Sequence, residues 1–268
     1  MTRIKTALLT SRAFNFIRHC PSREIETVSI DSSSWPQRRY VPGKDRDARD
    51  TRLIEWLAGQ QDVRILEIRR EGGWLNEFHL PAGALSRLKT LACDASIAMI
   101  LPGRFVQCAS INPTYPKLLG GPKPIAGQLS ETPLPPALIA ALPSSLQELK
   151  LGMKSDEIIN RLTLLSNHAP HISYLLIEIP TPPHFDICQA IAPILAAFTV
   201  LDSFILNFTK LKWSDVTSYA TGSTQLLLTQ WMQACPSLRT ARINDGVDDP
   251  WIDDAAMPRQ MHCMKGRR

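Results

Sequence analysis

The chain has 268 residues, of which 44% are hydrophobic, and it carries a formal net charge of +5. This composition is far from that of disordered chains, so we expect a folded protein with a substantial core. The charge is modest and no basic stripe with interleaved aromatic residues is present, which argues against nucleic-acid binding. The longest apolar run, residues 190–201, is too short to span a bilayer, so we expect no membrane association.

The six cysteines show no Cys-x-x-Cys spacing, and this usage suits a reducing compartment. Residues 1–23 are rich in arginine and free of acidic residues, as a mitochondrial presequence would be. However, residues 14–22 have the same form as residues 230–237, and both segments end in Cys-Pro-Ser. We therefore interpret residues 11–22 as the helix of a first repeat and expect a cytoplasmic or nuclear protein.

A cassette recurs along the chain: an apolar helix, a short break and a strand with the pattern apolar-x-x-apolar-x-apolar. Because each such unit buries its apolar side only against its neighbours, this recurrence predicts a solenoid. Clear strand patterns begin at Ile25, Val63, Leu146, Ile172 and Leu201, and weaker ones begin at Leu88 and Leu238. The long step from Leu88 to Leu146 predicts one degenerate copy between Cys93 and Leu146.

Apolar residues three and four positions apart give each predicted helix one buried stripe. The helices are predicted over residues 52–57, 158–165, 187–198 and 226–232. Asp156 is a candidate amino-terminal cap for the second helix. Pro170 and Pro236 should end helices, because proline disfavours helical geometry in the residue before it. Residues 113–136, rich in proline and glycine, are predicted to form a long irregular loop.

Strand and helix stacked in register predict an α/β fold with a parallel sheet on the concave side and helices on the convex side. We assign residues 1–255 to this solenoid and residues 256–268 to a basic flexible tail.

The repeat endings at residues 142–151 and 234–240 resemble the degenerate leucine-rich repeats of F-box-type proteins, particularly of large fungal families. The resemblance implies a leucine-rich-repeat-like solenoid whose array binds a target protein. In that family, a separate amino-terminal helical F-box binds the Skp adaptor of a cullin ubiquitin ligase. Residues 134–139 resemble an F-box opening, but a repeat strand follows too soon to leave room for its helices. We expect either a shortened product or a repeat protein that never carried the adaptor module.

The chain departs from that family at the consensus asparagine that follows each strand. Other residues stand at this position, namely Lys154, Pro180, Thr209 and Gly246. The stacked asparagine ladder of the family is therefore not expected here.

Candidate metal and catalytic residues are few. His168, His171 and the nearby His184 lack a further ligand at a spacing that suits tetrahedral coordination. Met261–Met264 contains soft ligands suited to copper but lies in the predicted tail. Cysteines before proline recur at one repeat position, which indicates a structural role rather than a nucleophile. We therefore expect no enzyme activity, no metal and no cofactor.

The residues that flank the last two apolar positions of each strand should point away from the core. We expect them to form a protein-binding concave face of Ile65, Glu67, Arg69, Glu148, Lys150, Tyr174, Leu176, Glu178, Ile205, Asn207, Arg242 and Asn244. Tyr174, Leu176 and Ile205 are predicted to form an outward apolar patch of the kind that marks protein contacts. Tyr174 and Arg242 are the expected anchors of binding.

The favoured function is protein recognition, as the target-binding region of an F-box-type ubiquitin-ligase adaptor. The partners are then a target protein and, if a longer product carries an F-box, the Skp adaptor and cullin. The alternative is a stand-alone interaction scaffold with no link to ubiquitin. A hydrolase with an unrecognised site is a third hypothesis.

Overall fold

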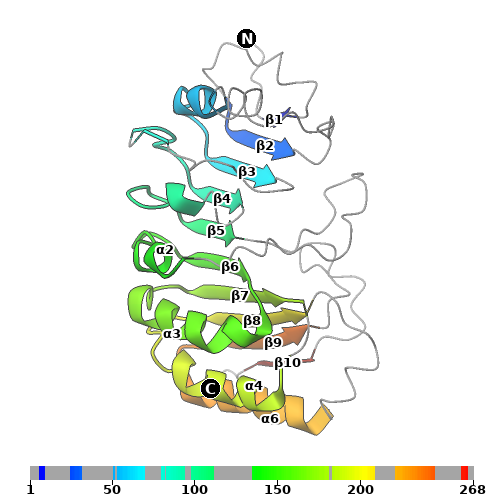
Figure 1. The fold of residues 1–268 in the computed structure, drawn as a ribbon. Coiled ribbons are helices and arrows are strands. Elements are labelled where there is room, and N and C mark those ends of the chain that lie inside the picture. Colours follow the sequence, from blue (N-terminus) through cyan, green and yellow to red (C-terminus); the bar gives the residue numbers. More distant parts are fainter. Residues whose placement is uncertain are drawn as a thin grey trace. The chain divides into compact units, whose positions relative to one another are not determined.

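A computed structural model describes residues 6–9, 25–31, 51, 53–69, 80–81, 83–93, 98–111, 135–180, 183–208, 221–244 and 261–264. These residues form an α/β fold that divides into two compact units, Met1–Ile111 and Asn112–Arg268. In each unit, strands that follow one another along the chain also pair side by side (Figure 1). The predicted α/β class and the predicted parallel sheet are therefore confirmed.

The first unit contains a sheet in which all described neighbouring strands are parallel. Its strands are β1 (Thr6–Leu9), β2 (Thr27–Asp31), β3 (Ile65–Arg69), β4 (Thr90–Cys93) and β5 (Cys108–Ile111). Residues 51 and 53–58 are helical, and the 3-10 helix η3 (Ala98–Ile100) lies between β4 and β5. The connections in this unit therefore combine helix with tight turns.

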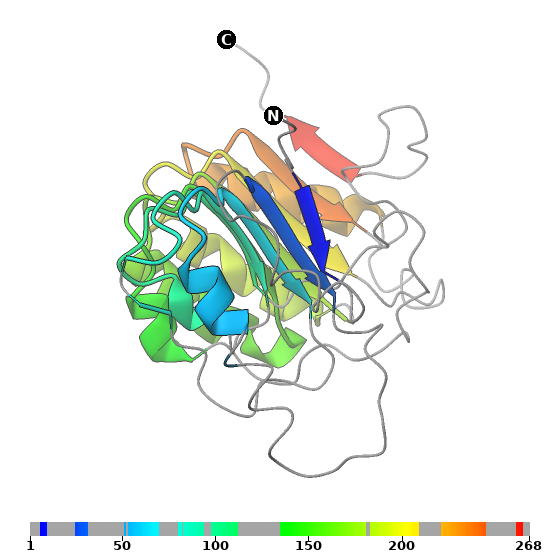
Figure 2. The same ribbon diagram turned by 90° about the horizontal axis from the view of Figure 1, so that it is seen from above.

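The second unit contains a sheet of four parallel strands and one antiparallel strand. The parallel strands are β6 (Glu148–Gly152), β7 (Tyr174–Ile179), β8 (Ser203–Phe208) and β9 (Thr240–Asn244), and β10 (Met261–Met264) pairs antiparallel with β9. The helices are α2 (Pro136–Ala140), η4 (Ser155–Glu157), α3 (Ile158–His168), α4 (Phe185–Leu195) and α6 (Thr221–Ala234). Helices α3, α4 and α6 lie together on one face of the strands β6–β9 (Figures 1 and 2).

The core of the second unit lies between its sheet and these helices. Leu149, Leu175 and Phe204 occupy the same register on adjacent strands and are fully buried. Trp231 of α6 is also fully buried, and its ring meets that of Phe204 edge to face with centroids 5.1 Å apart. Its indole Nε1–H donates a hydrogen bond to the carbonyl of Cys188 in α4 at 2.9 Å, which joins the two helices.

Main-chain hydrogen bonds repeat at the amino-terminal edge of both sheets. The carbonyl of Glu26, one residue after the first apolar position of its cassette, accepts hydrogen bonds from the amides of Arg64 (2.8 Å) and Ile65 (3.0 Å). Five further carbonyls at the equivalent position each accept hydrogen bonds from the two corresponding amides of the following repeat. They belong to Arg64, Lys89, Gln147, Ser173 and Asp202. We call this series the carbonyl ladder. It confirms the repeat register and needs no particular side chain.

The structure confirms the predicted helices and the degenerate repeat. The four predicted helices fall on the helical residues 51 and 53–58 and on α3, α4 and α6. The third of them was predicted to reach Phe198, but α4 ends at Leu195. The missing copy is β5, which lies within Val106-x-x-Ala109-x-Ile111. Pro170 and Pro236 follow the ends of α3 and α6, as predicted.

Three local predictions were wrong. Asp156 lies inside η4 and not at the cap of α3, whose cap residue is Glu157, and no side chain caps that helix in the described part of the chain. Pro136 belongs to α2 and not to the preceding loop, because proline is well suited to the first position of a helix. Met261–Met264 of the predicted tail forms β10, because a sheet edge offers unpaired main-chain groups to an extended segment.

Other predictions lie outside the described residues. These are the helix over residues 11–22 and residues 113–134 of the predicted loop. Sequence analysis also overlooked β1, which lies within a further copy of the strand pattern, Ile4-x-x-Ala7-x-Leu9.

Candidate functional site

The face of the strands β6–β9 opposite α3, α4 and α6 carries the predicted binding residues of the second unit. We call it the non-helical face, and strand register arranges its residues in three rows. The first row contains Glu148, Tyr174, Ser203 and Thr240. The second row contains Lys150, Leu176, Ile205 and Arg242. The third row contains Gly152, Glu178, Asn207 and Asn244.

The centre of the second row is closed to solvent. Leu176 is 2% exposed and Ile205 is 4% exposed, so the predicted outward apolar patch was wrong. The two side chains are register partners and lie between Lys150 and Arg242, which are themselves half-buried. Long cationic side chains commonly lay their aliphatic stems along apolar neighbours. Leu176 and Ile205 therefore stabilise the fold and are not available as a contact surface.

The first row is more accessible. Glu148 is exposed, and Tyr174 beside it on β7 is half-buried. Burial and then the charge of Glu148 raise the pKa of Tyr174 to about 12, with Glu178 adding to the effect and Arg242 opposing it. Tyr174 therefore keeps its phenolic proton at neutral pH and can act as a hydrogen-bond donor beside a carboxylate.

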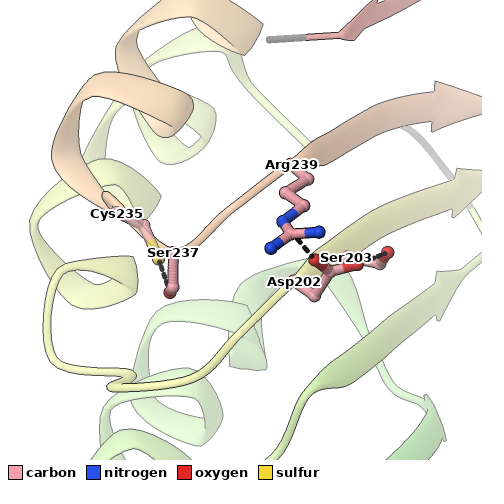
Figure 3. Close-up of polar contacts among 5 residues, drawn as sticks. All are labelled: Asp202, Ser203, Cys235, Ser237 and Arg239. Carbon is pink, nitrogen blue, oxygen red and sulfur yellow. Dashed lines mark hydrogen bonds and ion pairs between the residues drawn. The ribbon is translucent and has the colours of Figure 1, made fainter. Parts of the chain in front are cut away.

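An ion pair borders the first row at the amino-terminal edge of the sheet (Figure 3). Arg239 Nε lies 3.3 Å from Asp202 Oδ1, and the Arg239 side chain is 83% exposed. The hydroxyl of Ser203 donates to the other oxygen of Asp202 at 3.3 Å, which ties the pair to the first row (Figure 3). Sequence analysis overlooked this pair. The sequence feature that could have predicted it is a pair of opposite charges at one position of consecutive repeats. The first unit has a second such pair, in which a guanidinium nitrogen of Arg87 lies 2.7 Å from Asp62 Oδ1.

The first row and this ion pair together form the surface that we call the polar strip. Its members are Glu148, Tyr174, Ser203, Thr240, Asp202 and Arg239. It combines a half-buried aromatic ring, hydroxyl groups and charges of both signs. Such a surface suits a polar peptide or protein partner, because tyrosine and arginine often dominate binding energy.

The third row adds a hydrogen-bond acceptor. Asn207 Oδ1 is buried and has no hydrogen-bond partner among the described residues. A buried polar atom of this kind is usually satisfied by water or by a bound group. Asn207 thus brings an unused polar atom to the third row. The side chain of Asn244 lies outside the described residues.

The first unit carries the remaining predicted residues. Ile65 is 36% exposed. Glu67 accepts a hydrogen bond from the hydroxyl of Ser29 at 3.2 Å, across the β2–β3 pair. The side chain of Arg69 lies outside the described residues.

The candidate metal and thiol residues lie on several elements: His168 ends α3, His184 precedes α4, Cys235 follows α6, and Met261–Met264 forms β10. Within the described ranges, no three His, Cys, Asp or Glu side chains are grouped so that they could hold a metal ion. Cys235 is fully buried, and its sulfur lies 3.3 Å from Ser237 Oγ (Figure 3). The same sulfur lies 3.9 Å from the carbonyl oxygen of Phe198. These contacts join the end of α6 to the preceding repeat and suit a structural thiol. A helix long and apolar enough to cross a bilayer is missing from the described part of the chain.

The comparisons with known proteins add no family. The chain matches no protein-family model, and no curated protein shows significant similarity to it. The likeness to F-box-type leucine-rich repeats therefore depends on the repeat endings alone.

Proposed function

We propose that the chain is a protein-recognition module whose polar strip contacts the partner. The observation that carries the proposal is the half-buried Tyr174 beside the exposed Glu148, in a row continued by Ser203 and Thr240. Tyrosine brings a large apolar ring and a polar tip, and it loses little side-chain freedom on binding. Tyr174 is the proposed anchor.

We propose further that the repeats form a leucine-rich-repeat-like solenoid, with the sheet on the concave side. Two observations support this architecture. Within each unit, the described parallel strands pair in chain order, and the carbonyl ladder recurs at one cassette position in both units. In such arrays, neighbouring repeats build extended binding surfaces from equivalent positions.

The proposed context is the target-binding region of an F-box-type ubiquitin-ligase adaptor in the cytoplasm or nucleus. Its support is the sequence resemblance of the repeat endings. The alternative is a stand-alone scaffold that binds a partner without recruiting a ligase.

Affinity purification of the endogenous protein, followed by mass spectrometry, identifies the partner and separates these two contexts. Skp adaptor and cullin in the eluate support the ligase context, and the other enriched proteins are then candidate targets. One reproducible partner without ligase components favours the scaffold.

Substitution of Tyr174 tests the polar strip once the partner is known. We expect Tyr174→Ala to weaken binding by about 2 kcal/mol, while Tyr174→Phe keeps most of the affinity. Leu226→Ala is the matched control, because Leu226 is 53% exposed on α6, away from the non-helical face. Equal affinity of Tyr174→Ala and the control, with both variants folded, would reject the polar strip as the contact surface.

A further inference from the structure

The edge of β9 is covered by a strand from the chain itself. In β10, Met261, His262, Cys263 and Met264 pair antiparallel with Ile243, Arg242, Ala241 and Thr240. Helix α6 contacts both β9 and β10. The position beside β9 therefore offers a strand two kinds of contact: main-chain partners along β9 and a helix against one face.

Strand β10 is joined to its neighbour by fewer register pairs than the parallel strands of the second unit. Four register pairs join it to β9, whereas six join β7 to β8. Residues 245–260 connect β9 to β10, and this connection is far longer than the two-residue turns that close tight hairpins. A longer connection raises the entropic cost of bringing the two strands together. A short edge strand with one described strand neighbour opens locally at a lower free energy than the whole fold.

We propose that the β9 edge is a docking site for an extended peptide of a partner protein, added as an antiparallel strand in place of Met261–Met264. In strand addition, main-chain hydrogen bonds supply affinity and alternate side chains supply specificity. This site is the main-chain edge of β9, whereas the proposed function uses side chains of the polar strip, with Thr240 as the residue that both share. Tyr174 is not part of the edge, so substitution of Tyr174 tests the proposed function separately.

The register defines the peptide that fits. Of the two β9 residues involved, Ala241 is fully buried and Ile243 is half-buried. The peptide positions that pair with them therefore favour apolar side chains. The position between them lies opposite Arg242, where the chain itself places His262. An acidic residue there would put a carboxylate beside the guanidinium, because directly opposed side chains of opposite charge attract. The partner segment is therefore apolar–acidic–apolar.

A competition experiment on the full chain tests the proposal. The probes are fluorescent synthetic peptides of residues 259–266, one with the natural sequence and one with glutamate at the His262 position, used under reducing conditions. Along an antiparallel edge strand, successive amides alternate between donating to the partner strand and pointing away from it. His262→Pro/Cys263→Pro therefore removes one donating amide, whichever of the two residues supplies it. His262→Ala/Cys263→Ala is the control, because it keeps both amides.

We expect the proline variant to bind both peptides at least tenfold more tightly than the natural chain does, because its own strand no longer competes at an effective concentration in the millimolar range. We expect the alanine variant to resemble the natural chain and the glutamate peptide to bind more tightly than the natural peptide. Equal peptide binding by the proline and alanine variants would overturn the proposal.

Hydrogen exchange of the unmodified chain provides a second readout that does not depend on how the variants fold. We expect amides of Thr240–Asn244 to exchange faster than those of Tyr174–Ile179 and to be slowed by excess glutamate peptide. Exchange of both strands at the rate of global unfolding would show that β10 does not open, and the docking site would then be rejected.

Discussion

The two units start their strands with the same carbonyl ladder but stabilise the connecting segments differently. In the first unit, the guanidinium of Arg104 donates to the carbonyls of Ala84 (3.2 Å), Pro81 (3.1 Å) and Leu80 (3.5 Å), and also to that of Ile100. In the second unit, α3 packs on α4 and α4 packs on α6, with Trp231 buried among them. One arginine thus holds the turns in the first unit, whereas aromatic packing holds helices in the second.

The difference is clearest when the β4–β5 connection of the first unit is compared with the helical connections of the second unit. Residues 94–107 between β4 and β5 contain η3 and a tight turn in which Gly103 adopts a φ of 74°. Arg104 of this segment donates to the carbonyl of Ile100 within it and to three carbonyls of residues 80–84 before β4, so one side chain satisfies main-chain groups of two turns. The longer connections of the second unit contain α-helices that satisfy their own main chain, and they need only an apolar stripe to pack. Similar strands therefore tolerate different connections.

The largest expected effect is in the second unit, at Trp231. Trp231→Ala removes a fully buried ring and leaves the carbonyl of Cys188 without its indole donor, so we expect a loss of about 3–5 kcal/mol in the free energy of unfolding. Trp231→Phe is the matched control and should lose less, because a ring still contacts Phe204. Denaturant unfolding gives the total, and hydrogen exchange should show the loss in β7 and β8. An equal loss in β3 and β4 would contradict the separate stabilisation of the two units.

Arg104 is the corresponding test in the first unit. Arg104→Ala removes the guanidinium donor from four carbonyls, of which that of Pro81 keeps a hydrogen bond from the Ala84 amide. We expect it to cost about 2 kcal/mol, since water replaces part of the bonding. Arg104→Lys should recover little, because an ammonium cannot reproduce the guanidinium fork. Faster hydrogen exchange in β4 and β5, with β7 and β8 unchanged, would support the comparison. A lysine variant as stable as the natural chain would show that charge alone suffices.

Tyr174 makes the second unit sensitive to high pH. Its pKa is raised from 10.0 to about 12 in the folded state, so the folded protein holds this proton more tightly than the unfolded chain does. The resulting stabilisation is fully present below pH 10.0 and is lost as the pH rises through about 12. Ultraviolet absorbance titration of the natural chain and of Tyr174→Phe should identify one late-titrating tyrosine. Ionisation of Tyr174 near its ordinary pKa would contradict its half-buried position.

The smallest expected effects are at the two ion pairs of the amino-terminal edges. Asp202→Ala and Asp62→Ala should each cost less than about 1 kcal/mol, because both pairs are largely exposed and the ladder beneath them is made of main-chain atoms. Added salt should reduce the difference between each variant and the natural chain. A loss of several kcal/mol in either variant would show that the side chains support the ladder.

The buried half of the fold could be predicted from the sequence because the apolar pattern repeats. Copies with large central residues, such as Leu149 or Leu175, stand out clearly, whereas Ala7 and Ala109 in the same position weaken the copies in β1 and β5. The site was less predictable. Alternation shows that Leu176 points to the non-helical face, but it does not show whether neighbours cover it. Strand β10 could not be predicted from side-chain pattern, because main-chain groups hold it at the sheet edge.

In the described repeats, the carbonyl ladder also makes little use of the side chain at its own position, although Ser173 Oγ donates to the Gln147 carbonyl at 3.1 Å and Asp202 pairs with Arg239. The bonds of the ladder are made by main-chain atoms, and residues as different as Glu26, Arg64, Gln147 and Ser173 occupy this position. The side chain at this position can therefore be substituted while the main-chain bonds keep the register of the repeats. Substitutions at Glu26, Arg64 and Gln147 would thus change the charge of this edge one repeat at a time, while the main-chain bonds of the ladder are retained.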